Sequence, residues 1–293
     1  MKNKLTNQHE DMSFFKTALM LNGSVTPKVI KKVIMLIIYA TIVSYLSNTY
    51  PFLALPIGPF EYGGLIMGLI LVFRINAGYD RWWEARKLWG SIVNQSRNLT
   101  IILVNYTTHT DSAWLLKITN YLSALPYLIK EQLRETKDIE SVKHFIDDST
   151  YQTLLKSNNP PNLLSSMIAN ELHYARDHYG LDPFSFIRAE EERGRLTDAQ
   201  GACERILKTP MPFVMAIKSR RFILFFLLVL PFALIDVSLF ITPWISGIVA
   251  YAMLSLDQIG IELQNPFSHE NLSHLPLNDI CQTIEKNIAE LRG

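Results

Sequence analysis

The clearest pattern along the chain is a helical segment, Gly63 to Gly90, whose apolar first half runs without a turn signal into a polar second half. Every position from Leu65 to Phe73 is apolar except Gly68, which is typical of a helix that is buried on all sides, in lipid or in a helix bundle. Charged residues and tryptophans begin directly after Phe73. The pattern therefore predicts one helix that crosses from a membrane into water.

Three further apolar segments occur, at Val33 to Leu46, Phe222 to Ile235 and Val237 to Leu256. The first would span only about 21 Å as a helix, against about 30 Å of bilayer hydrocarbon. Its uncharged continuation, Ser47 to Tyr50, and snorkelling of the lysines before it can supply the missing length. Together with the first helix, these segments predict four transmembrane spans.

The distribution of Lys and Arg predicts the orientation of these spans. The connections Ser47 to Tyr62 and Asp236 to Trp244 contain neither residue, so we expect both to face away from the cytoplasm. Basic residues gather at the opposite ends of the spans, at Lys28, Lys31, Lys32, Arg74, Arg81, Arg86, Lys87, Lys218, Arg220 and Arg221. The first residues are charged and lack an apolar stretch of signal-peptide length. We therefore expect a multi-pass protein of the inner membrane with both termini in the cytoplasm.

The middle of the chain is polar and shows helical spacing of apolar residues, for example over Ser112 to Leu133 and Ile187 to Leu207, with a break at Asn158 to Asn162. No alternating strand pattern is present, so the expected fold is all-α. The expected division is an N-terminal cytoplasmic segment, two spans, a large helical cytoplasmic domain, two more spans and a C-terminal cytoplasmic segment, at residues 1–27, 28–76, 77–218, 219–264 and 265–293.

Composition and motifs exclude several classes of function. The formal charge of +1 on 293 residues gives no reason to expect a nucleic-acid partner. The two cysteines, Cys203 and Cys281, lie far apart in predicted cytoplasmic segments, so neither a disulfide nor a metal site is expected. No catalytic motif and no phosphate-binding glycine loop are found. We expect neither an enzyme nor a bound cofactor or metal.

Two sets of residues on the first helix suggest how copies of the chain could assemble. Gly64 and Gly68 form a GxxxG pair, which lets helix backbones approach closely in lipid. Leu65, Leu69 and Phe73 follow at intervals of four on an adjacent face and could point toward a common axis. The alternative interpretation is that all five are ordinary lipid-facing or packing residues.

Three stretches, Arg74 to Gly90, Ala202 to Phe213 and Leu263 to Cys281, together resemble the prokaryotic branch of the bestrophin family, and they occur in that family's order. The resemblance implies a homopentameric channel in the lipid bilayer that passes small monovalent ions. Its pore would lie on the five-fold axis, lined by the second span and its cytoplasmic continuation.

The resemblance also assigns individual residues. The family's hydrophobic neck precedes an Arg-Trp-Trp motif, here Arg81 to Trp83, and falls on Leu65, Leu69 and Phe73. A second, cytoplasmic constriction follows an Asp-Pro pair in the family, which makes Phe184 the candidate aperture residue. Arg74 could face the axis, but we expect it to pair with a carboxylate or a phospholipid.

Animal bestrophins bind calcium through an acidic run after an Asn-Pro-Phe motif. Here Asn265 to Phe267 is followed by a stretch whose only carboxylate is Glu270, whereas a calcium site needs six or more oxygens, usually with several carboxylates. No calcium clasp is expected.

Passive conduction through the neck is the expected mechanism. An ion stripped of water in apolar surroundings faces a Born cost of tens of kcal/mol, so the neck conducts only while it stays wet. Glu61, just outside the second span, would form an acidic ring at the outer mouth that favours cations, whereas helix N-termini aimed at the pore would favour anions. The prokaryotic branch that the sequence resembles includes sodium-conducting members, so the resemblance also favours cations, with sodium as the expected ion. An anion (chloride) channel of the same architecture, a non-conducting membrane-anchored binding or signalling protein, and a transporter are the alternatives.

Overall fold

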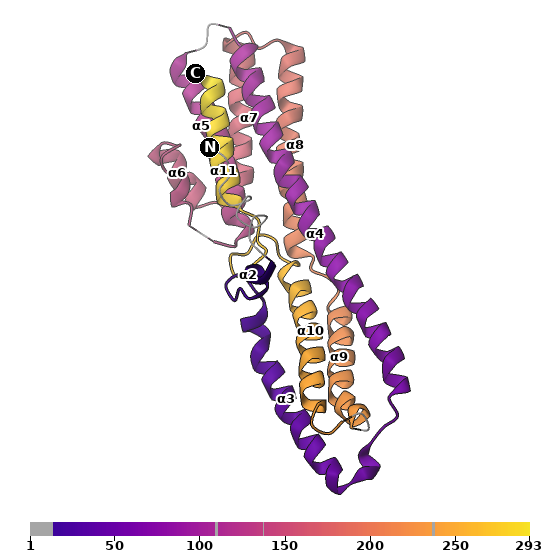
Figure 1. Ribbon diagram of the computed structural model, residues 1–293. Coiled ribbons are helices and arrows are strands. Elements are labelled where there is room, and N and C mark those ends of the chain that lie inside the picture. The colour runs from indigo at the N-terminus through magenta and orange to yellow at the C-terminus, as the bar shows by residue number, and fades with distance from the viewer. Residues whose placement is uncertain (1–13, 109–110, 137, 236–237) are drawn as a thin grey trace. The chain divides into compact units, whose positions relative to one another are not determined.

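The computed structural model describes residues 14–108, 111–136, 138–235 and 238–293, and within these ranges the secondary structure is entirely helical (Figure 1). The α-helices are α2 Phe14–Ala18, α3 Thr26–Thr49, α4 Gly58–Asn105, α5 Ser112–Leu133, α6 Asp148–Leu155, α7 Pro160–His178, α8 Pro183–Lys208, α9 Phe213–Leu234, α10 Thr242–Glu262 and α11 Leu277–Arg292. Two short 3-10 helices are η1 Pro51–Leu53 and η2 Glu140–Val142. Residues 1–13 of the predicted N-terminal segment, and Val237, with which the predicted fourth span began, lie outside the described residues.

The chain forms two compact units. The first contains the residues up to Tyr79 and Met211–Gln264, so it holds α2, α3, the start of α4, α9 and α10. The second contains Asp80–Pro210 and Asn265–Gly293, so it holds the rest of α4, α5 to α8 and α11. The helix α4 therefore contributes residues to both units.

In the first unit α10 packs against both α3 and α9 (Figure 1). Proline occupies the first turn of α3 and of α10, where its missing N–H costs no intrahelical hydrogen bond. A small core joins α4, α9 and α10 through Met67, Leu71, Ile223, Leu227, Ala250 and Met253. The approach of α3 to α10 is close because Gly247 has no side chain: a Cβ there would lie 2.7 Å from Cγ1 of Ile37.

Three helical segments among the described residues are long and apolar enough to cross a membrane: Thr26–Thr49, the stretch Pro51–Asn105 that includes α4, and Thr242–Glu262. The third predicted span, Phe222 to Ile235, corresponds to α9 and does not meet this measure. The reason is that the first half of α9 contains three charged residues, Lys218, Arg220 and Arg221. The predicted fourth span also differs, because its helix begins at Thr242 and continues to Glu262.

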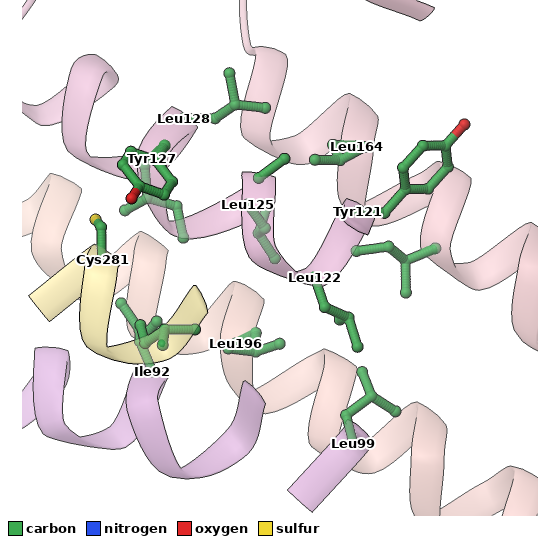
Figure 2. Close-up of a cluster of buried hydrophobic side chains, with 14 of the residues drawn as sticks. Ile92, Leu99, Tyr121, Leu122, Leu125, Tyr127, Leu128, Leu164, Leu196 and Cys281 are labelled. Carbon is green, nitrogen blue, oxygen red and sulfur yellow. The ribbon is translucent and has the colours of Figure 1, made fainter. Parts of the chain in front are cut away.

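The second unit has a large core to which α4, α5, α6, α7, α8 and α11 contribute side chains, and Figure 2 shows part of it. Ile92, Leu99, Leu122, Leu128 and Leu196 are among its fully buried side chains. The predicted helical spacing over Ser112 to Leu133 is confirmed by α5, which has the same bounds. The predicted Ile187 to Leu207 helix lies within α8.

Capping side chains fix where these helices begin. Asp111 accepts a hydrogen bond from the N–H of Ala113 at α5, and Asn159 accepts one from the N–H of Asn162 at α7. The predicted break at Asn158 to Asn162 is therefore confirmed as the start of a helix. At α6 Asp147 accepts hydrogen bonds from the N–H and the hydroxyl of Thr150.

Both cysteines are free and buried in the second unit. Burial raises the pKa of the Cys203 thiol to about 12 and that of the Cys281 thiol to about 12. Both sulfurs therefore stay protonated and unreactive at neutral pH.

Candidate ion pathway

The first part of α4 has two different faces. Met67 and Leu71 are 5% and 1% exposed, because they pack against α9 and α10. Leu65, Leu69 and Phe73, the three predicted neck residues, are 75%, 55% and 63% exposed. Their spacing of four places them along one face of the helix, and within the subunit this face stays largely uncovered.

We call Leu65, Leu69 and Phe73 the neck row. A soluble helix would bury such a row, so its exposure requires a different environment: lipid, another copy of the chain, or a pore. Phe73, at one end of the row, also lines a cavity of about 190 Å³ beside Arg74, Met215 and Ser219.

Arg74 follows Phe73 directly and is 6% exposed. Its guanidinium group forms an ion pair with the carboxylate of Asp257 on α10, which confirms the expectation that Arg74 pairs with a carboxylate. Arg220 on α9 donates a hydrogen bond from Nε to the other carboxylate oxygen of Asp257 at 3.3 Å. Asp257 was missed by sequence reasoning, although an acidic residue directly after the apolar run of the fourth span was a signal.

Gly64 and Gly68, the predicted packing pair, have different surroundings. A Cβ on Gly64 would lie 3.7 Å from the Phe226 ring of α9, whereas a Cβ on Gly68 would meet no atom within 4 Å. Among the glycines of α4, Gly78 has the tightest surroundings, since a Cβ there would lie 3.0 Å from Cβ of Leu263, directly after α10. Gly78 and its neighbour across the contact, Gly260, are not spaced as a motif in the sequence, so a GxxxG search does not find them.

Glu61 is exposed in the first turn of α4, four residues before Leu65. The positive end of the helix dipole lies at this turn, so it stabilises a carboxylate there and partly offsets its negative charge. Because Glu61 lies four residues before Leu65, it occupies the same helix face as the neck row, at the N-terminal end of that row.

Phe184, the predicted aperture residue, is 85% exposed at the start of α8. Asp182 caps this helix by accepting hydrogen bonds from the N–H groups of Phe184 and Ser185, at 3.0 and 3.2 Å. Phe184 also lines a groove of about 540 Å³ that includes Asn98 of α4 and Tyr106, the residue after this helix. Its ring is thus held on a rigid, capped helix end and projects from the second unit.

The Arg-Trp-Trp motif has a structural role in the second unit. Arg81 donates hydrogen bonds to the carbonyl oxygens of Ile206 and Thr209, which are groups that the end of α8 leaves without an intrahelical partner. The Trp82 indole N–H donates to the carbonyl oxygen of Ser273 at 2.7 Å. The motif thereby ties α4 to α8 and to the loop before α11.

The Asn-Pro-Phe segment is held in place by its own hydrogen bonds. Asn265 accepts from the N–H of Phe267 at 3.1 Å, and Phe267 is fully buried. Glu270, the only carboxylate in the stretch from Ser268 to Leu275, is exposed. Among the residues that the structure describes, no group of three or more His, Cys, Asp and Glu side chains is placed to hold a metal ion. The expected lack of a calcium clasp stays a prediction.

An all-helical chain with an exposed apolar row and several helices of membrane-spanning length is a multi-pass membrane protein. The family described as bacterial/fungal bestrophin protein matches residues 5–290. A crystal structure of a bacterial bestrophin homolog from Klebsiella pneumoniae is 29% identical, with a TM-score of 0.83, and the match covers 90% of this chain and 98% of that chain. The chain belongs to the bestrophin family, as its sequence motifs predicted. It is a member of a family of channel-forming proteins and not an enzyme.

Curated relatives share most of the chain. A voltage-dependent anion channel-forming protein of Synechocystis sp. is 32% identical over 92% of this chain and 88% of its own length. A protein of the same description from Nostoc sp. is 32% identical over 95% of this chain and 91% of its own length. The corresponding Escherichia coli K12 protein is 31% identical over 92% of this chain and 88% of its own length.

The expectation of a cation-selective, sodium-conducting channel is wrong, because these relatives are named anion channel-forming proteins. That expectation rested on Glu61 and on the sodium-conducting members of the prokaryotic branch that the sequence resembles. One carboxylate at a helix N-terminus is a weak basis for the sign of selectivity, since the helix dipole offsets part of its charge.

Proposed function

We propose that the chain forms an oligomeric anion channel that conducts small monovalent anions passively. The observation that carries this proposal is 31–32% identity, over 92–95% of the chain, to relatives named voltage-dependent anion channel-forming proteins. The exposed neck row supports it, because an apolar row that the subunit itself does not cover fits a lining built from several copies.

The assembly we propose is a homopentamer in the inner membrane, with the first unit in the bilayer and the second in the cytoplasm. Each subunit would contribute four spans, α3, the start of α4, α9 and α10. The basic residues in the first half of α9 would lie at the headgroups, and its remaining apolar turns would be lengthened by snorkelling. Both termini would then be cytoplasmic.

In this proposal Leu65, Leu69 and Phe73 form the neck, and Phe184 forms a second constriction in the cytoplasm. The neck conducts when it is wide enough to hold water and closes by dewetting, because its side chains offer an ion no polar partner. Gly64 and Gly68 would allow neighbouring copies of α4 to approach. Glu61 would lie at the outer mouth, where its charge repels anions, so the preference for anions must arise elsewhere.

The test is a planar-bilayer recording of the purified protein in asymmetric NaCl, in which the reversal potential gives the sign of selectivity. We expect the reversal potential to shift from zero toward the equilibrium potential of chloride. Leu69→Ala and Phe73→Ala should each raise the single-channel current about twofold or more, because a wider neck stays wet.

Ile38→Ala serves as the matched control, since Ile38 is a 57% exposed apolar residue on α3, away from the neck row. Its current should equal that of the wild type. Unchanged current in both neck variants would remove these residues from the neck, and purified protein without ion flux would favour a non-conducting binding role.

A further inference from the structure

The ionised side chains near the end of the neck row form a cluster with a net positive charge. Arg74 and Arg220 contact different oxygens of one carboxylate, that of Asp257. Two guanidinium groups therefore share one negative charge. Arginine stays protonated at any physiological pH, so one positive charge of this cluster is left uncompensated.

The cluster combines a buried pair with a half-exposed cation. The side chains of Arg74 and Asp257 are 5% and 11% exposed, and that of Arg220 is 51% exposed. Charges in a region of low dielectric are screened less than charges in water, so their field extends further. Arg220 extends the uncompensated charge toward the surface of the subunit.

The position of the cluster links it to the neck row. Phe73 and Arg74 line the same cavity of about 190 Å³, together with Ser219, the residue before Arg220. Each member of the cluster also stands at the end of an apolar run: Arg74 after Phe73, Asp257 after Leu256, and Arg220 two residues before Phe222. The cluster thus reaches the last neck residue through Arg74, which follows Phe73 in the chain and lines the same cavity.

We propose that the Arg74–Asp257–Arg220 cluster biases the ion pathway toward small monovalent anions, with Arg220 setting the strength of the preference. The inference rests on the proposed channel function, and it names the source of the charge preference that Glu61 does not supply. Arg74 and Asp257 neutralise each other, and Arg220 adds the positive field. Identical copies around a common axis would multiply this field at the inner end of the neck.

The decisive variant is Arg220→Gln, which removes the surplus charge and leaves the buried pair in place. Reversal potentials in asymmetric NaCl should show a fall of about threefold in the ratio of chloride to sodium permeability. Arg220→Lys, which keeps the charge, should restore most of the ratio. Arg221→Gln is the matched control: it loses the same charge one residue along α9, from an exposed side chain with no contact to Asp257 in the described structure.

Thermal unfolding and the oligomer profile of each variant should match the wild type, so that a change in permeability reports charge rather than misfolding. Equal ratios in Arg220→Gln, Arg221→Gln and the wild type would overturn the inference and leave an anion-selective wild type intact. Equal shifts in both Gln variants would also overturn it, in favour of a general surface-charge effect. A sodium-selective wild type would defeat the proposed function alone, provided that Arg220→Gln still changes the ratio more than Arg221→Gln does.

Discussion

The two units of the chain bury apolar side chains to very different extents. In the second unit the helices enclose one large core, and large residues such as Trp89 and Phe267 are completely buried. In the first unit the core is small, and apolar residues such as Met35, Phe225 and Ile248 remain more than half exposed. The second unit buries most of its large apolar side chains within a single copy of the chain, whereas the first unit leaves many of them uncovered.

The difference shows where the stability and the function of each unit come from. The second unit gains its stability from side chains packed within one copy of the chain. The first unit depends on what surrounds it, whether lipid or further copies, and its exposed residues are therefore available for an ion pathway. Substitutions of buried residues in the second unit should therefore change mainly the stability of the subunit. Substitutions of exposed residues in the first unit should change mainly ion conduction or assembly.

The largest expected effect on stability comes from Trp89→Ala. Removing this fully buried side chain should destabilise the second unit by about 3–5 kcal/mol, because the cavity it leaves cannot collapse completely. Leu69→Ala should cost less than about 0.5 kcal/mol, since its side chain has few contacts within the subunit. Thermal unfolding followed by circular dichroism in detergent measures both. Similar losses for the two variants would break the contrast between the units.

A smaller effect is expected from Gly247→Ala in the first unit. The added methyl group would lie 2.7 Å from Cγ1 of Ile37, so α3 and α10 must separate or Ile37 must move, at a net cost of about 1 kcal/mol. Gly68→Ala is the matched control within one subunit, because its methyl group would meet no atom within 4 Å. Melting temperatures in detergent compare the two.

Gly68→Ala also tests the predicted packing between copies. If neighbouring copies of α4 pack through Gly68, the variant should lower the pentamer fraction in native mass spectrometry while leaving the subunit folded. A normal oligomer profile would assign Gly68 to lipid contact instead.

An effect on stability that depends on pH is expected at the start of α6. Hydrogen bonds from the hydroxyl of Ser149 and from the backbone and side chain of Thr150 hold the pKa of Asp147 well below its usual value. Asp147→Ala should cost about 1 kcal/mol at neutral pH. Because the folded-state pKa is lowered, this stabilisation is complete above the unfolded pKa of about 3.9 and is lost as the pH falls further.

Unfolding free energies at pH 7 and at successively lower pH below about 4 measure this dependence. The gap between the wild type and Asp147→Ala should narrow over that range. Asp148→Ala, at the next residue, removes a carboxylate that does not cap the helix and should show a smaller gap. A gap that stays constant with pH would mean that the Asp147 carboxylate is not the cap.

Much of the fold could be predicted because its signals are local. Apolar spacing gave α5 its bounds, and the break at Asn158 to Asn162 marked the start of α7. The extent of α4 was underestimated: the expected helix ended at Gly90, whereas α4 runs from Gly58 to Asn105. Beyond Gly90 the buried residues are interleaved with polar ones, and only tertiary packing reveals them as a core face.

The contacts around the candidate pathway could not be predicted from the sequence, because they join residues that are far apart along the chain. Arg74 and Asp257 lie far apart in the sequence, and no spacing rule connects them. The same holds for the approach of Gly78 to Leu263, which depends on how α4 and α10 cross. The sign of ion selectivity was mispredicted because it was inferred from Glu61 and from sodium-conducting members of the family, and neither shows which charged groups the folded chain brings together, such as Arg74, Arg220 and Asp257.

The burial of Cys203 and Cys281 has a practical consequence. Since neither native sulfur should react with a maleimide, the unmodified sequence can serve as the background for cysteine-scanning accessibility experiments. Reporter thiols introduced one at a time along α4 could then be modified from either side of the bilayer, and block of conduction would map which of them face the permeation route.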